Sequence, residues 1–225
     1  YLEEVAKTAP ALNVAVLIGH HTARRQAMGG VENQPPSETE MASMLTSVEE
    51  GMEAGAVGLS TGLVYEPGRY ASTEEVADLA KVVGKYGGLY VSHMRDEGAG
   101  LLDSVRETLH IGEVSGCGVE ISHHKTVGSD NWGQVTHSLA MIEEAVAKGH
   151  DATADQYPYT ARSTMLFALV QNGTFGAGDG GAMGRSEPSE VLLCSVPGRA
   201  EYEGRTLQSF VEEYDLPGEK AANRL

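Results

Sequence analysis

The sequence predicts an α/β fold in which parallel β-strands alternate with helices. Three observations support this prediction: short apolar runs rich in β-branched residues recur along the chain, segments of helical periodicity lie between them, and glycines stand where a helix gives way to a strand. Each strand and helix together take roughly 30–40 residues, as in a right-handed βαβ crossover. Two architectures fit this repeat, the doubly wound open sheet and the (β/α)8 barrel.

The predicted strands are apolar runs bounded by glycine or polar residues. They span residues 13–19, 56–61, 88–93, 118–123 and 151–157. None of them is followed by a G-x-G-x-x-G or Walker pattern, so the sequence does not indicate a nucleotide-binding fold.

The predicted helices carry apolar residues at spacings of three and four, which places each set on one helix face against the sheet. The sets are Met41, Met44, Leu45, Val48 and Met52; Val76, Leu79, Ala80 and Val83; Leu102, Val105 and Leu109; and Val135, Leu139, Ile142 and Val146. The second of these helices begins with a capping-box pattern, in which Ser72 is followed three positions later by Glu75. Another helix is predicted where the sequence opens, at residues 1–9.

The repeat of strands and helices stops after Tyr159. Residues 172–185 are rich in glycine and predict a loop, residues 191–196 predict a strand, and residues 206–214 predict a helix. We interpret this stretch as a segment inserted into the main fold.

The composition excludes several classes of partner. The net charge is −16, with 32 acidic and 16 basic residues, which disfavours nucleic acid because phosphate binding needs a basic face. Such acidity is typical of a well-hydrated surface, and a salt-adapted host is the alternative. No run reaches the ~20 apolar residues of a membrane span. Cys117 and Cys194 are too few for a disulfide framework, so we expect a cytoplasmic protein.

Histidines close two consecutive predicted strands, His93 at the end of GLYVSH and His123 at the end of GVEISH. In parallel α/β folds the carboxyl ends of the strands share one edge, where active sites lie. Neighbouring strands are ~4.8 Å apart, so two imidazoles at this edge can bind one metal ion. Other polar residues gather at the same edge: His20, His21, Tyr65, Arg95, Glu97, His124, Lys125, Asp155, Tyr157 and Tyr159. This convergence predicts an active site.

Several segments together carry a resemblance to a known family. They are residues 55–75 (GAVGLSTGLVYEPGRYASTEE), 90–97 (YVSHMRDE), 121–125 (ISHHK), 131–133 (NWG) and 155–164 (DQYPYTARST). In this order they resemble the N-acyl-D-amino-acid deacylases, or D-aminoacylases, of the amidohydrolase superfamily. The combination of SHMRDE, SHHK and DQYPYTA is the most specific part. Residues 18–29 are similar to the GHxTLRxxxMG segment of that family, and residues 196–207 resemble its YEGRTL segment.

The resemblance implies a partial (β/α)8 barrel of the metal-dependent amidohydrolase kind, with zinc bound by His93 and His123. In ISHHK the implied ligand is the first histidine, because it directly follows Ser122, and His124 occupies a variable position. The implied reaction is zinc-dependent hydrolysis of the amide bond of N-acyl-D-amino acids to a D-amino acid and a carboxylate.

The resemblance also implies substrate contacts. They come from Tyr65, Lys125, Tyr157 and Ser163. An ammonium group such as that of Lys125 suits the free carboxylate of an N-acyl amino acid.

Some residues of the family pattern have no counterpart in this sequence. They are the His-x-His of the first strand, a cysteine ligand from an early strand, and the aspartate that serves as ligand and general base. We therefore expect an internal piece of a longer enzyme, with the general base outside this chain and no activity by itself. The expected parts are a partial catalytic barrel over residues 1–165, a glycine-rich loop and short inserted segment over 166–200, and a helical segment over 201–225 that returns toward the rest of the barrel.

Two alternative functions remain at this point. One is a cyclic-amide hydrolase of the dihydroorotase or hydantoinase type, which has the same barrel and a different pocket. The other is a metal-free barrel that acts as a scaffold or binding module.

Overall fold

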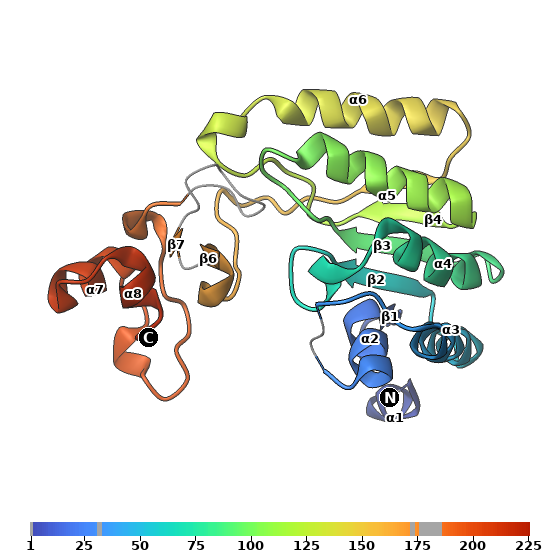
Figure 1. The fold of residues 1–225 in the computed structure, drawn as a ribbon, viewed down its shortest axis with the longest axis horizontal. Coiled ribbons are helices and arrows are strands. Elements are labelled where there is room, and N and C mark those ends of the chain that lie inside the picture. The colour runs from blue at the N-terminus through green and yellow to red at the C-terminus, as the bar shows by residue number, and fades with distance from the viewer. Residues whose placement is uncertain (1, 31–32, 172–173, 176–185) are drawn as a thin grey trace.

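The computed structural model describes residues 2–30, 33–171, 174–175 and 186–225. Its central feature is a parallel five-stranded sheet in the order β1-β2-β3-β4-β5 (Figure 1). The strands are β1 (Leu17–Gly19), β2 (Gly58–Gly62), β3 (Leu89–His93), β4 (Gly118–Ile121) and β5 (Ala152–Ala154). Each strand pairs with the next one along the chain, whereas a doubly wound sheet reverses its order at a switch point. The architecture is therefore part of a barrel wall.

Helices α2 to α6 lie in a row along the sheet, and each contacts the next one (Figure 1). The α-helices are α1 (Leu2–Thr8), α2 (His20–Met28), α3 (Glu38–Glu53), α4 (Thr73–Gly84), α5 (Leu101–Ser115), α6 (Gln134–Ala147), α7 (Leu207–Tyr214) and α8 (Gly218–Ala222). The short 3-10 helices are η1 (Gly68–Tyr70), η2 (Ser129–Asn131), η3 (Leu166–Leu169), η4 (Pro188–Glu190) and η5 (Ala200–Tyr202). No helix in these described ranges is long and apolar enough to cross a membrane.

The main hydrophobic core lies between the sheet and the row of helices. Fully buried Leu59, Tyr90 and Ile121 from the strands pack with the apolar faces of α3, α4 and α5. Met44 and Val48 of the predicted methionine stripe are fully buried in the same cluster. The helical periodicity in the sequence is thus explained by core packing.

Strand lengths differ from the predicted ranges. The first strand covers only residues 17–19 of the predicted 13–19, and the last only 152–154 of the predicted 151–157. The fourth strand ends at Ile121 because His123 adopts a φ of 42°, which is incompatible with extended backbone. The residues that follow β4 and β5 therefore belong to loops at the edge where polar residues gather, whereas residues 13–16 precede β1 at the opposite edge.

The capping-box prediction for α4 is half correct. Ser72 is the N-cap residue, and its side chain accepts a hydrogen bond from the backbone N–H of Glu75. The Glu75 carboxylate does not return to the N-cap. Instead it accepts from His20 and Arg24, because two buried donors outcompete one exposed backbone group. A complete capping box occurs at α3, between Ser37 and Glu40.

A second, smaller hydrophobic cluster lies in the carboxyl-terminal part of the chain, around fully buried Leu207 and Phe210. The helix predicted at 206–214 is confirmed by α7. The strand predicted at 191–196 is wrong, because this segment forms only one isolated bridge, between Leu192 and Thr206. Within the predicted loop 172–185, Thr174–Phe175 forms β7 and pairs with β6 (Val170–Gln171), and the rest of that range lies outside the described residues.

Candidate metal centre

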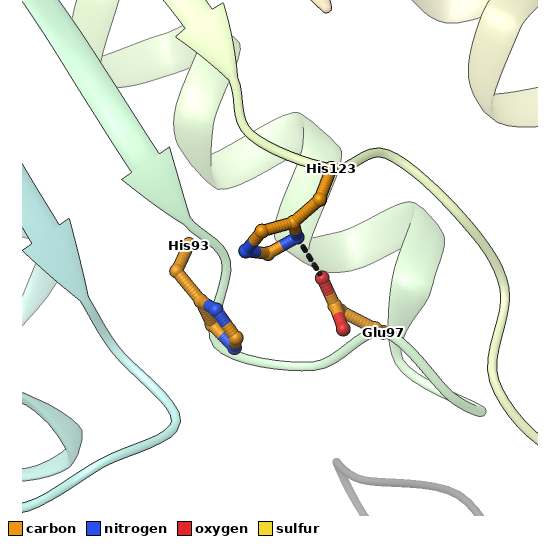
Figure 2. Close-up of side chains that lie close together, drawn as sticks. All are labelled: His93, Glu97 and His123. Carbon is orange, nitrogen blue, oxygen red and sulfur yellow. Dashed lines mark ion pairs between the residues drawn. The ribbon is translucent and has the colours of Figure 1, made fainter. Parts of the chain in front are cut away.

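Two histidine side chains meet at the carboxyl edge of the sheet. His93 is the last residue of β3, and His123 follows the end of β4. Their ring centroids are 4.5 Å apart at an interplanar angle of 73° (Figure 2). Nε2 of His93 is buried without a hydrogen-bond partner among the residues that the structure describes. A buried imidazole nitrogen without a partner is costly unless a ligand such as a metal ion binds it.

A buried carboxylate completes the cluster. Oε1 of Glu97 lies 2.9 Å from Nδ1 of His123 and 2.8 Å from Nζ of Lys125. The potential ligand atoms of His93, Glu97 and His123 all lie within 4.8 Å of one another. The sequence placed Glu97 at this edge but gave no sign of its contact with His123, since the two residues come from loops after different strands.

The backbone at His123 is fixed by the loop after β5. Its N–H donates to a carboxylate oxygen of Asp155, and the N–H of His124 donates to the backbone oxygen of Asp155 at 2.8 Å. These two bonds hold His123 in its left-handed conformation, which non-glycine residues seldom adopt. The ring of His123 therefore projects toward His93, while the side chain of His124 lies outside the cavity.

The electrostatics favour neutral imidazole beside a charged carboxylate. Burial lowers the pKa of His93 to about 4, although the Glu97 carboxylate raises it. Burial raises the pKa of Glu97, but hydrogen bonds from His123 and Lys125 outweigh burial and hold that pKa below its ordinary value. Neutral imidazole and ionised carboxylate are ligand types that zinc accepts. The side chains present thus fit a zinc ion.

All six residues predicted for the site line one cavity of about 90 Å³. They are Tyr65, His93, His123, Lys125, Tyr157 and Ser163, and the cavity wall also contains Glu97, Arg162 and Thr164. Burial lowers the pKa of Lys125, although the adjacent Glu97 raises it. Prediction from sequence missed Arg162, although it directly precedes Ser163 in the DQYPYTARST segment.

The tyrosines of the cavity have defined contacts. The Tyr65 hydroxyl lies 2.9 Å from Oγ1 of Thr164, and its ring centroid lies 5.0 Å from that of His93. Nζ of Lys125 lies 5.6 Å from the ring centroid of Tyr157, within range of a cation–π interaction. Each tyrosine ring of the cavity therefore contacts a proposed metal-binding or substrate-binding residue.

Two histidines from the same edge lie outside the cavity. We expected His20 on the rim with His93, but its side chain is fully buried and Nε2 lies 2.9 Å from Oε1 of Glu75. Arg24, also fully buried, is 2.5 Å from the other oxygen of Glu75. His20 begins α2, so its side chain enters the core instead of the rim. His124 is buried as well, with Nε2 2.9 Å from Oγ of Ser138 in α6.

Comparison with known proteins places these features in context. No model of a protein family matches the chain. The chain is 40% identical over 166 residues to a D-aminoacylase of Alcaligenes xylosoxydans xylosoxydans, a match that covers 74% of this chain and 34% of that protein. It is 43% identical over 157 residues to an N-acyl-D-glutamate deacylase of the same organism, covering 70% of this chain and 32% of the relative.

Solved structures agree with these relatives. The crystal structure of N-acyl-D-glutamate deacylase from Bordetella bronchiseptica, complexed with zinc and a phosphonate inhibitor, aligns with a TM-score of 0.86 and 32% identity. That alignment covers 99% of this chain and 44% of the solved chain. A crystal structure of D-aminoacylase aligns with a TM-score of 0.78 and 32% identity, over 96% of this chain and 42% of that one. The chain thus spans less than half the length of the proteins that it matches.

Proposed function

Because the chain belongs to the family of D-aminoacylases and N-acyl-D-amino-acid deacylases, we propose that it serves the zinc-dependent hydrolysis of N-acyl-D-amino acids to a D-amino acid and a carboxylate. One observation carries the proposal. His93 and His123 meet in a cavity that also contains the Lys125 ammonium group and two tyrosines. A metal site next to a cation suits a substrate that has an amide bond close to a free carboxylate.

His93 and His123 would hold the zinc ion. When bound, zinc lowers the pKa of water and polarises a carbonyl group. Catalytic zinc sites commonly use three protein ligands and one open position. The sequence offers no counterpart of the remaining family ligands or of the general base, so the complete site needs residues beyond those of this chain.

Substrate recognition would fall to the other cavity residues. Lys125 would pair with the α-carboxylate of the substrate, at a position fixed by its own bond to Glu97. Tyr65, Tyr157 and Ser163 would contact the substrate around this carboxylate and the scissile amide. When the carboxylate and the amide are held at fixed positions, the side chains of the D and L enantiomers point in different directions, so the space that receives the side chain can distinguish them.

Three further proposals concern the setting of this activity. The two separate hydrophobic clusters support a division into a partial barrel over residues 1–165, an inserted segment over 166–200 and a returning helical segment over 201–225. Both cysteines are free thiols, which supports a cytoplasmic protein. The net charge of −16 supports a small-molecule substrate over nucleic acid.

The test uses the full-length gene product. We expect zinc to copurify, and we expect release of carboxylate from N-acetyl-D-methionine or N-acetyl-D-glutamate but not from their L enantiomers. Ring-opening of hydantoin without deacylation would favour the cyclic-amide hydrolase. Absence of both zinc and turnover would favour a scaffold or binding module.

A further inference from the structure

Glu97 is the most completely buried ionisable group of the cavity, and the proposed function uses it only as a partner of Lys125. Its side chain is 2% exposed, and a single oxygen, Oε1, lies at hydrogen-bond distance from both His123 Nδ1 and Lys125 Nζ. A carboxylate buried to this degree is retained only when its partners compensate the loss of hydration. Its two partners are a presumed metal ligand and a presumed substrate-binding residue.

The contact with His123 determines which ring nitrogen can bind a metal. Nδ1 of His123 lies 2.9 Å from Oε1 of Glu97 and 3.0 Å from Nζ of Lys125. The ammonium group has two other acceptors, Oε1 of Glu97 and the backbone oxygen of His123 at 2.9 Å. An ionised carboxylate can only accept hydrogen bonds, so a proton on Nδ1 of His123 avoids two lone pairs facing each other at 2.9 Å. A neutral imidazole with a proton on Nδ1 presents its lone pair at Nε2. Nε2 faces away from Glu97 (Figure 2). Glu97 thereby selects the ring form of His123 that can donate to a metal ion through Nε2.

Glu97 is itself held in place by its loop. The backbone N–H of Asp96 donates to Oγ of Ser104 at 2.9 Å, and the N–H of Gly98 donates to Oδ1 of Asp96 at 2.6 Å. The backbone oxygen of Glu97 also accepts from the N–H of Val127 at 2.7 Å. Both the main chain and the side chain of Glu97 therefore contact the loop that carries His123. Such fixed hydrogen-bond partners orient metal-binding histidines and strengthen their donation.

We propose that Glu97 is a positioning residue that fixes the ring of His123 for zinc and, through the same oxygen, the ammonium group of Lys125 for the substrate. The inference rests on the zinc site of the proposed function, and it does not depend on which amide is hydrolysed. In this arrangement the Glu97 carboxylate orients both the metal-binding residue His123 and the substrate-binding residue Lys125.

The distances argue against Glu97 as a direct zinc ligand through Oε1. Oε1 lies 2.9 Å from Nδ1 of His123 and 2.8 Å from Nζ of Lys125, which are hydrogen-bond distances. Two donors occupy the two lone pairs of this oxygen, which leaves none for a metal ion. A hydrogen-bonded support and a direct ligand also differ in what their removal does, and this difference supplies the test.

The test measures zinc affinity in the full-length protein by competition with a fluorescent chelator. For Glu97→Gln we expect a dissociation constant about 10–100-fold weaker than wild type, with one zinc per chain still bound at saturation. The matched control is Glu107→Gln. Glu107 is a largely buried carboxylate that pairs with Arg95 at 2.9 Å and touches neither His123 nor Lys125 in any described contact. Its zinc affinity should equal that of wild type.

Glu97→Gln leaves the ammonium of Lys125 without its anionic partner, which can impair folding. The double variant Glu97→Gln with Lys125→Met removes both charges, and compared with Lys125→Met alone it should show the same 10–100-fold loss. Wild-type affinity in Glu97→Gln would overturn the inference. So would a loss well beyond 100-fold, as expected for His123→Ala, because that result would make Glu97 a direct ligand. A wild-type protein that binds zinc but deacylates nothing would refute the proposed function alone.

Discussion

Replacement of the adjacent histidines His123 and His124 by alanine should separate metal binding from stability. The side chain of His123 is 29% exposed, so its loss should cost roughly 1 kcal/mol of folding free energy in metal-free protein. His124 is 5% exposed and bonded to Ser138, so its loss should cost roughly 2–3 kcal/mol through a cavity and a broken hydrogen bond. Ser138 keeps a partner, since its hydroxyl also donates to the backbone oxygen of Val135.

The zinc affinities should follow the opposite order. Structural zinc sites bind with ~10–16 kcal/mol shared among four ligands, so one lost ligand costs roughly 3–4 kcal/mol, or about 100–1,000-fold in affinity. We expect this loss for His123→Ala and equally for His93→Ala, together with nearly all deacylase activity. His124→Ala should keep one zinc per chain despite its lower stability.

The assay combines elemental analysis of dialysed full-length protein, urea unfolding of the chelator-treated variants, and hydrolysis of N-acetyl-D-methionine. If His124→Ala loses zinc and His123→Ala keeps it, the wrong histidine has been chosen. If neither variant loses zinc, the zinc interpretation itself is refuted.

Three further changes test other parts of the site and fold. Lys125→Met should raise KM for an N-acyl-D-amino acid by roughly 30-fold or more, the equivalent of ~2 kcal/mol, and unchanged steady-state kinetics would count against its pairing with the substrate carboxylate. Arg162→Gln should raise KM for N-acetyl-D-glutamate about 10-fold more than for N-acetyl-D-methionine, because it removes a second cation from the cavity wall; equal increases would contradict this reasoning. Burial raises the pKa of Glu75, but the hydrogen bonds and charges of His20 and Arg24 outweigh burial and lower that pKa. The ionised Glu75 carboxylate therefore stabilises the fold at neutral pH, and this stabilisation is lost as the pH falls below the ordinary glutamate pKa of ~4.3. Glu75→Gln should therefore cost roughly 3–5 kcal/mol in urea unfolding at pH 7 and progressively less in acid, whereas a constant difference would disprove the linkage.

The sequence predicted the strands, their parallel order and the two histidines because these features depend on local patterns. An apolar run followed by a polar residue predicts a strand end, and the position of His93 at the end of such a run is visible without coordinates. The choice between an open sheet and a barrel depended on the family resemblance, since both architectures have the same local repeat. The strand order in the structure then excluded the doubly wound sheet.

The errors share a physical cause, which is the competition of distant partners with local ones. Ser72 and Glu75 have the spacing of a capping box, yet Glu75 turns to Arg24, 51 residues away in sequence. Glu97 reaches His123 only because its loop folds back over the end of β4. A periodic pattern carries no information about such charge pairs, so only the structure shows the contact between Glu97 and His123.

The order of the sheet also determines when the cavity can form during synthesis. Each strand pairs with the one made just before it, so every new unit of strand and helix can dock as soon as it leaves the ribosome. At 5–20 residues per second a unit emerges every roughly 2–8 s, which is long compared with the docking of a helix. His93 is complete two units before Tyr157, which follows β5. A nascent chain therefore carries single histidines without their cavity for several seconds, and the two imidazoles come together only when β4 pairs with β3.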